Sequence, residues 1–176
     1  MNPNEKLSEH FTLAELTYTE VRLPNNPPVM YIPKLKALCD HILEPVRARF
    51  GRPVRVNSGF RCDAVNTRVG GSPKSQHRKA EAVDHEIDGV SNRELFRWIV
   101  DNLDFDQVIL EFVGHLDSAN EWHDDVEGNQ GWVHCSYVAD RPNRKSIKVA
   151  RRVRGEDGRI KTQYQTMTAE EVRAWQ

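Results

Sequence analysis

The sequence predicts an α+β fold, a small antiparallel sheet with flanking helices in a single domain of residues 1–176. Three observations support this prediction. Segments with the 3.6-residue period of helices and segments with the two-residue alternation of strands follow each other in mixed order. No repeat or low-complexity stretch interrupts them. The length of 176 residues, with 38% apolar and 29% charged residues, suits one hydrophobic core.

The N-terminal segment is expected to hold one short helix and one loop. Thr12 is followed three residues later by Glu15, which is typical of a capping box and predicts a helix over 12–17. Three prolines in residues 18–31 predict a loop there.

Residues 33–50 are predicted to form the longest helix. Apolar side chains recur at helical spacing, and the pattern stops at Gly51. These positions are Leu35, Leu38, Ile42, Val46 and Phe50. Pro45 lies inside the segment, and its missing N–H and its ring are expected to kink or weaken the helix.

The middle of the chain alternates between the two kinds of element. Residues 53–59 predict a strand, and residues 61–76 a short helix followed by a long loop. A further strand is predicted over 81–87. Ser91 is expected to cap a helix over 92–102.

The C-terminal half is predicted to be mainly strands. The expected elements are strands at 105–112 and 131–138 with a polar loop between them, strands at 145–153 and 159–165, and a last helix at 167–175 capped by Thr168. A Gly-Glu-Asp-Gly turn joins the last two strands and predicts a hairpin. Hairpin and helix form a C-terminal segment of about 145–176.

Composition excludes several classes of protein. A net charge of −1 gives no basic field for nucleic acid or an anionic membrane. The odd number of cysteines, 3, does not resemble the framework of a disulfide-stapled secreted domain. No basic stretch followed by an apolar run opens the chain, so synthesis in the cytoplasm without a signal peptide is expected, as is a monomer without membrane insertion.

Three side chains are candidates for a metal site. His77 ends a predicted loop, Asp84 lies in the following strand, and His134 lies in the predicted strand over 131–138. Zinc binds both residue types and takes three protein ligands when a water occupies the fourth position. Strand alternation turns Cys135 away from the face of His134. The chain has no HExxH motif, the helix of many zinc peptidases.

Ordered motifs extend this pattern along the chain. Ser75-x-His77-x-x-x-x-Ala82-x-Asp84 is preceded by Ser58-Gly59-Phe60-Arg61 and followed by Trp132-Val133-His134. Residues 11–16 and 105–111 add Phe-Thr-Leu-Ala-Glu-Leu and Phe-Asp-Gln-Val-Ile-Leu-Glu. Over residues 11–137 the chain resembles the zinc D-Ala-D-Ala carboxypeptidases, a family that also contains phage L-alanyl-D-glutamate endopeptidases.

The resemblance implies a fold, a cofactor and an activity. The fold would be that of the hedgehog-like zinc peptidases, and one Zn²⁺ would be held by His77, Asp84 and His134. The reaction would be hydrolysis of peptide bonds in peptidoglycan stem peptides, by a phage or prophage lytic or virion-associated enzyme acting on the cell wall. Arg61 would hold a substrate carboxylate, because a guanidinium binds carboxylates bidentately.

The remaining site residues are expected around this centre. Ser75, Gln107 and Trp132 are expected to line the substrate site, and Ser58 and Glu86 to support the ligands from behind. Glu86 is also an alternative base. For His115 and His123, in the polar segment before the last ligand, solvated loop positions are expected.

Two positions depart from the family's pattern. Ala80 stands where the family usually has glycine, which is tolerable unless the backbone needs a positive φ. Gly131 stands where many members have a carboxylate, three residues before the last histidine. We therefore assign the general base to Glu111, which ends the predicted strand over 105–112 and can face the attacking water.

Two alternatives remain open. Cys62 could be a nucleophile paired with a histidine, although nothing in the sequence positions such a pair. A non-catalytic, zinc-containing module that binds the cell wall or is structural would also fit the fold, and Gly131 favours it. Whether the enzyme is a carboxypeptidase or an endopeptidase depends on loop shape around Arg61 and residues 113–131.

Overall fold

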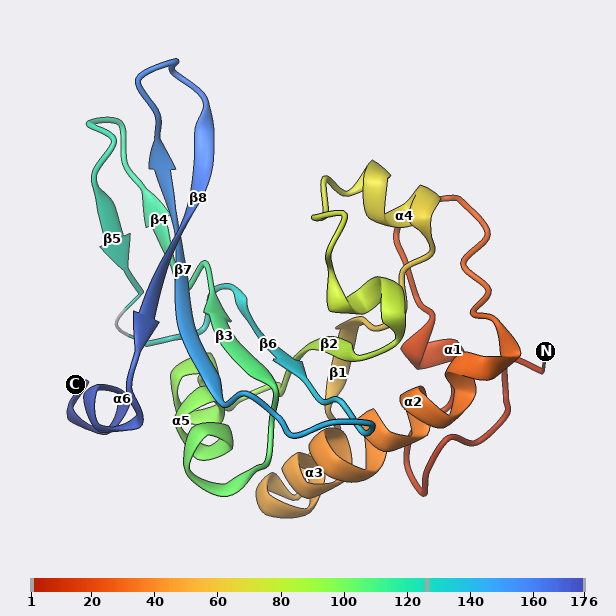
Figure 1. Cartoon of the computed structure of the whole chain (residues 1–176). Helices are drawn as coiled ribbons and strands as arrows, with labels where there is room; N and C mark the ends of the chain where they lie inside the picture. Colours follow the sequence, from red (N-terminus) through yellow and green to blue (C-terminus); the bar gives the residue numbers. More distant parts are fainter. Residues whose placement is uncertain (1, 126, 176) are drawn as a thin grey trace.

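A six-stranded sheet forms the centre of the molecule in the computed structural model, which describes residues 2–125 and 127–175 (Figure 1). The strands follow the order β1-β2-β6-β3-β7-β8 across the sheet. Their bounds are β1 Arg55–Ser58, β2 Ala82–Glu86, β3 Gln107–Glu111, β6 Trp132–Ser136, β7 Ser146–Arg154 and β8 Ile160–Met167. Every neighbouring pair is antiparallel except β3 and β7.

The sheet corrects two parts of the predicted fold. The mixture of helices and one sheet is confirmed, but the sheet has six strands and is not small. It is also not wholly antiparallel, because β7 runs parallel to β3. A parallel pair needs a long crossover connection, and here the chain between the two strands includes β6, which lies on the other side of β3. Local alternation of side chains carries no signal for such a pairing.

The predicted helix over 33–50 is present but is not a uniform α-helix. It consists of α2 (Ile32–Leu38), a π-helical turn η2 (Cys39–Leu43) and α3 (Glu44–Phe50). Pro45 lies in the first turn of α3, where a missing N–H costs least. The wider π turn thus lets the segment continue through the proline. Gly51 ends it with φ 62°.

The other predicted helices are confirmed with their caps. Their bounds are α1 Leu13–Leu16, α4 Asp63–Arg68, α5 Asn92–Asn102 and α6 Ala169–Ala174, and short 3-10 turns occur at η1 (Val29–Tyr31) and η3 (Gln76–Lys79). Thr12 and Thr168 form capping boxes, and the Ser91 side chain accepts a hydrogen bond from the backbone of Glu94. The Gly-Glu-Asp-Gly turn joins β7 and β8 as predicted.

The predicted polar loop between β3 and β6 is wrong in part. It contains a second sheet of two strands, β4 (Gly114–Leu116) and β5 (Trp122–Asp124). Each strand has only three residues and mixes polar with apolar side chains, so no alternation marks it.

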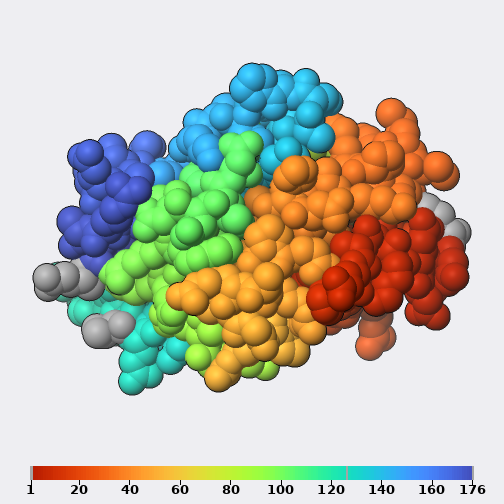
Figure 2. All heavy atoms as spheres, turned by 90° about the horizontal axis from the view of Figure 1, so that it is seen from below, coloured from red at the N-terminus to blue at the C-terminus, as the bar shows by residue number. Residues whose placement is uncertain are grey.

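One cluster of buried apolar side chains holds the helices against the sheet, and it includes residues from Leu7 to Val172. In α5, Leu95, Phe96 and Ile99 enter this core. The view from below shows α2 and α3 beside α5 on this side of the molecule (Figure 2). No helix formed by residues 2–125 and 127–175 has the length and apolar composition needed to cross a bilayer.

Candidate functional site

Two neighbouring strands and one turn bring the candidate ligands together. Asp84 of β2 lies directly opposite His134 of β6, and paired residues of antiparallel strands point to the same face. His77 comes from η3, the turn that precedes β2. All three side chains are buried.

The ligand atoms lie close to one another. Nδ1 of His134 is 2.9 Å from Oδ1 of Asp84 and 3.2 Å from Nε2 of His77. The Nε2 atom of His77 is 3.2 Å from the same carboxylate oxygen. Ligand atoms bound tetrahedrally to zinc at about 2.0–2.2 Å would be separated by roughly 3.3–3.6 Å. The triad therefore fits a small cation after an outward shift of a few tenths of an ångström.

A hydrogen bond fixes the orientation of His77. Its Nδ1 lies 2.7 Å from the carbonyl oxygen of Gly59. A carbonyl can only accept, so Nδ1 carries the proton and Nε2 presents its lone pair to the triad. A histidine that binds a metal is usually oriented in this way, by a hydrogen bond from the ring nitrogen that does not bind the metal.

Gly59 can hold this position only because it lacks a side chain. A Cβ there would lie 2.3 Å from the backbone oxygen of Leu16 in α1. The backbone N–H of Arg61 donates to the carbonyl of His77 at 3.1 Å, which joins the two segments again. The Ser-Gly-Phe-Arg motif thus positions His77 through its backbone.

The Arg61 side chain contacts the triad itself. Its Nε donates to Oγ of Ser58 at 2.7 Å, and a terminal nitrogen donates to Oδ2 of Asp84. Ser58 therefore supports Asp84 through Arg61. The guanidinium, expected to hold a substrate carboxylate, is bound to a carboxylate of the protein in this structure.

Asp84 carries a negative charge in the buried triad. Burial alone would raise its pKa, but the neighbouring imidazoles of His77 and His134 hold the pKa well below the usual range. A buried, ionised carboxylate next to two imidazoles favours a bound cation. The donor set of two histidines and one aspartate is one that zinc accepts.

Glu111 lies on the same face of the sheet, one strand beyond β6. Its neighbour across the strands is Trp132, two residues before His134. Burial raises the pKa of Glu111 to about 7, against a lowering effect of His134. Within residues 2–125 and 127–175 its carboxylate has no hydrogen-bonding partner. A half-buried carboxyl with such a pKa is suited to accept a proton near neutral pH.

The two unusual positions of the site, Ala80 and Gly131, both have positive φ. Ala80 has φ 58° and is fully buried. The backbone therefore needs a positive φ here, and alanine is less favourable than glycine at such a position. Gly131 has φ 70°, and a Cβ there would lie 2.0 Å from the carbonyl oxygen of Glu111. No side chain, and hence no carboxylate, fits at position 131 with this backbone.

Comparison with protein families identifies the chain. Residues 9–119, more than half of its 176 residues, match the family model described as Peptidase M15. The chain belongs to the M15 peptidase family. The matched stretch holds Arg61, His77, Asp84 and Glu111, and the third member of the triad, His134, follows it. No curated protein matches the chain.

Other predicted residues of this M15 peptidase lie near the triad to different degrees. Gln107 and Trp132 lie on the triad face of the sheet, and Ser75 precedes η3. The carboxylate of Glu86 accepts hydrogen bonds from Arg55 and Asn57 instead of contacting a triad residue. Cys62 bonds to the carbonyl of Pro24.

Sequence patterns missed two buried polar residues that hold the site together. Asp106 is fully buried and binds Arg141 at 2.7 Å, Arg144 at 2.5 Å and the amide of Gln76 at 3.0 Å. Gln76 directly precedes His77, so this cluster ties η3 to the start of β3. Asn25 donates to the carbonyl of Phe60 at 2.8 Å and fixes the proline-rich loop. In the sequence, Asp106 was marked only as an acidic residue within the motif of residues 105–111.

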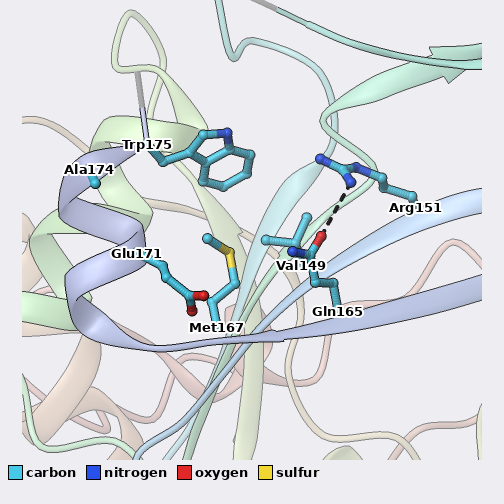
Figure 3. Close-up of a pocket in the computed structure, with 7 residues that line it drawn as sticks. All are labelled: Val149, Arg151, Gln165, Met167, Glu171, Ala174 and Trp175. Atoms are coloured by element: carbon cyan, nitrogen blue, oxygen red, sulfur yellow. Dashed lines mark hydrogen bonds between the residues drawn. The ribbon is translucent and has the colours of Figure 1, made fainter.

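Two other features lie apart from the triad. The exposed residues His115 and His123 stack on the hairpin β4–β5, where His123 pairs with Asp117 at 2.8 Å. A cavity of about 270 Å³ lies between α6 and the hairpin β7–β8 (Figure 3). Its lining residues Val149 and Arg151 alternate along β7 with residues of the triad face, so it opens on the opposite face of the sheet.

Proposed function

We propose that the protein is a zinc-dependent peptidase that hydrolyses peptide bonds in peptidoglycan stem peptides, as a D-Ala-D-Ala carboxypeptidase or an L-alanyl-D-glutamate endopeptidase. The observation that carries this proposal is the buried triad of His77, Asp84 and His134 with Glu111 on the same face of the sheet. Membership of the M15 family, whose peptidases are zinc-dependent, supports it.

The triad residues hold the metal and Glu111 handles the proton. Zinc, when bound, lowers the pKa of the attacking water and polarises the scissile carbonyl. Glu111 accepts a proton from this water while the water oxygen forms a bond to the carbonyl carbon. It passes the proton to the leaving nitrogen as the C–N bond breaks. Its pKa of about 7 suits both transfers.

Arg61 keeps Asp84 in place through its ion pair, while its partner Ser58 holds the guanidinium. Gln107 and Trp132, on the triad face, line the path of the substrate. The enzyme acts on the cell wall after release or within a virion, as a phage or prophage product. The proposed phage origin and site of action rest on the resemblance to the phage L-alanyl-D-glutamate endopeptidases.

The test measures cleavage and metal together. Purified peptidoglycan and a D-Ala-containing peptide are incubated with zinc-loaded protein, chelated protein and the Glu111→Gln variant. Mass spectrometry of the muropeptides identifies the bond that is cleaved. We expect cleavage only by zinc-loaded wild type, and full zinc content in Glu111→Gln. Inactivation by a thiol reagent but not by a chelator would overturn the metal assignment in favour of Cys62.

A non-catalytic wall-binding module is the second candidate, and Gly131 favours it because it replaces the usual carboxylate. The same experiment separates the two. Zinc-loaded wild type that sediments with peptidoglycan but releases no product from any substrate would be a binding module.

A further inference from the structure

A cation that makes no salt bridge within the described residues lies on β7, on the triad face of the sheet. The cross-strand row that contains Asp84 and His134 continues through Ile109 of β3 to Lys148 of β7. Residues paired in register point to the same face of a sheet. Lys148 therefore projects from the triad face, two strands beyond His134.

Lys148 lies against an aromatic ring and is paired with no acidic side chain of the described residues. Within the described part of the chain it makes no salt bridge, and its Nζ lies 5.7 Å from the ring centroid of Tyr164 on β8. Tyr164 is 53% exposed, unusually so for a large aromatic residue on a sheet face. A half-buried lysine without a counter-charge is less favourable than one whose charge is balanced by a ligand.

Tyr164 connects Lys148 to the proposed base. Glu111, Ala150 and Tyr164 form the next row across the sheet, and the small side chain of Ala150 separates the other two. Besides burial, the carboxylates of Glu111 and Asp84 raise the pKa of Tyr164. The phenol is therefore within electrostatic reach of the triad.

Arg61, by contrast, is not free for a ligand. Its guanidinium is bound to Asp84 and Ser58, and its side chain is 17% exposed. Arg152 and Arg154 also project from this face of β7, but only Lys148 lies on the row of Asp84 and His134, and among the described residues it makes no salt bridge.

We propose that Lys148, held against Tyr164, binds a carboxylate of the peptide substrate and so selects acidic peptides. This inference rests on the proposed function. Two strand spacings separate Lys148 from His134, roughly 10 Å. An extended peptide spans about 3.4 Å per residue. The carboxylate recognised here lies about two or three residues from the scissile bond.

The test uses two peptides that differ only at that position, one with a free carboxylate and one with a carboxamide. We expect Lys148→Met to raise KM for the carboxylate peptide about 10- to 100-fold with little change in kcat, and to leave the carboxamide peptide unaffected. Lys148→Arg should restore much of the preference. Unchanged discrimination in Lys148→Met would overturn the inference.

Lys161→Met is the matched control. It removes the same charge from the same hairpin, but Lys161 pairs with Val153, on the opposite face from the triad, and forms a salt bridge with Asp157. Its kinetics should equal those of wild type. An effect as large as that of Lys148→Met would show that net charge is responsible and would overturn the inference.

Binding separates this inference from the proposed function. Calorimetry with zinc-loaded Glu111→Gln protein compares both peptides, with and without Lys148→Met. If wild type cleaves neither peptide, the proposed function fails. The inference would still be supported if the carboxylate peptide binds more tightly than the carboxamide peptide and Lys148→Met removes this difference. Equal binding of the two peptides would overturn it.

Discussion

The backbone of Gly131 packs so closely against the carbonyl of Glu111 that a Cβ would lie 2.0 Å from that oxygen. Gly131→Ala is therefore expected to lower the free energy of unfolding by more than about 2 kcal/mol, measured by urea denaturation. Gly158, with φ 74° and open space within 4 Å of the position that a Cβ would take, is the control. Gly158→Ala should cost only about 1 kcal/mol. Equal costs would contradict the close approach.

Ala80 is expected to accept glycine but not a larger residue. Glycine relieves about 1–2 kcal/mol of left-handed backbone strain in the folded state. Two costs offset this gain: the unfolded chain is less restricted with glycine, and a buried methyl group worth about 0.8 kcal/mol is lost. Ala80→Gly should thus leave stability within about 1 kcal/mol of wild type. Ala80→Val should destabilise by more than about 2 kcal/mol, because a β-branched residue tolerates positive φ poorly. Thermal unfolding of both variants checks this, and a stable valine variant would argue against the backbone described.

Removal of the buried charge of Asp106 should weaken both the fold and the turn that carries His77. Breaking a buried ion pair costs about 3–5 kcal/mol, and Asp106→Asn, which keeps one acceptor, is expected to cost about 2–4 kcal/mol. Zinc content should also fall, because Gln76 loses a partner next to His77. Asp104→Asn, at a residue whose side chain is 59% exposed, should do neither.

Asp106 should also contribute to acid denaturation. Burial opposes ionisation, but hydrogen bonds from Arg144 and Arg141 hold the pKa of Asp106 far below its ordinary value. A lowered pKa in the folded state gives stability that is complete above the unfolded pKa of about 3.9 and is lost as pH falls below it. The stability difference between wild type and Asp106→Asn should therefore shrink below about pH 4 in a urea series.

His85 should make the protein sensitive to mild acid. It is fully buried, neither ring nitrogen has a partner within the described residues, and burial lowers its pKa to about 4. A neutral buried histidine gives stability above the unfolded pKa of about 6.5 that is lost as pH falls towards 4, roughly 3 kcal/mol in all.

His85→Leu, on the face opposite the triad, should therefore gain stability relative to wild type between pH 7 and pH 5. His115→Leu, at an exposed position, provides the comparison. A stability difference between wild type and His85→Leu that is independent of pH would refute a buried neutral imidazole.

The sequence predicted the elements with strong local signals and missed relations between distant residues. Capping residues such as Thr12 and the apolar period of residues 33–50 marked the helices because these signals join residues close together in the chain. The parallel pairing of β7 with β3 and the bonds of Asp106 to Arg141 and Arg144 join residues far apart in the chain. Patterns of single residues contain no information about such partners.

In the candidate site, too, the sequence motifs predicted which residues come together but not the contacts between distant side chains. Motifs placed His77, Asp84 and His134 in one group, and the structure brings them together; zinc binding by them stays a prediction. The ion pair between Arg61 and Asp84, and the hydrogen bonds of Glu86 with Arg55 and Asn57, depended on side-chain directions that alternation alone could not settle.

The central position of β6 determines when during synthesis the triad can form. β6 pairs with β2 on one side and β3 on the other, although both precede it in the chain. Until β6 has left the ribosome, β2 and β3 have no strand between them, and Asp84 lacks His134. A nascent chain therefore cannot close the sheet from its N-terminal part, and the triad assembles only after β6 has been synthesised.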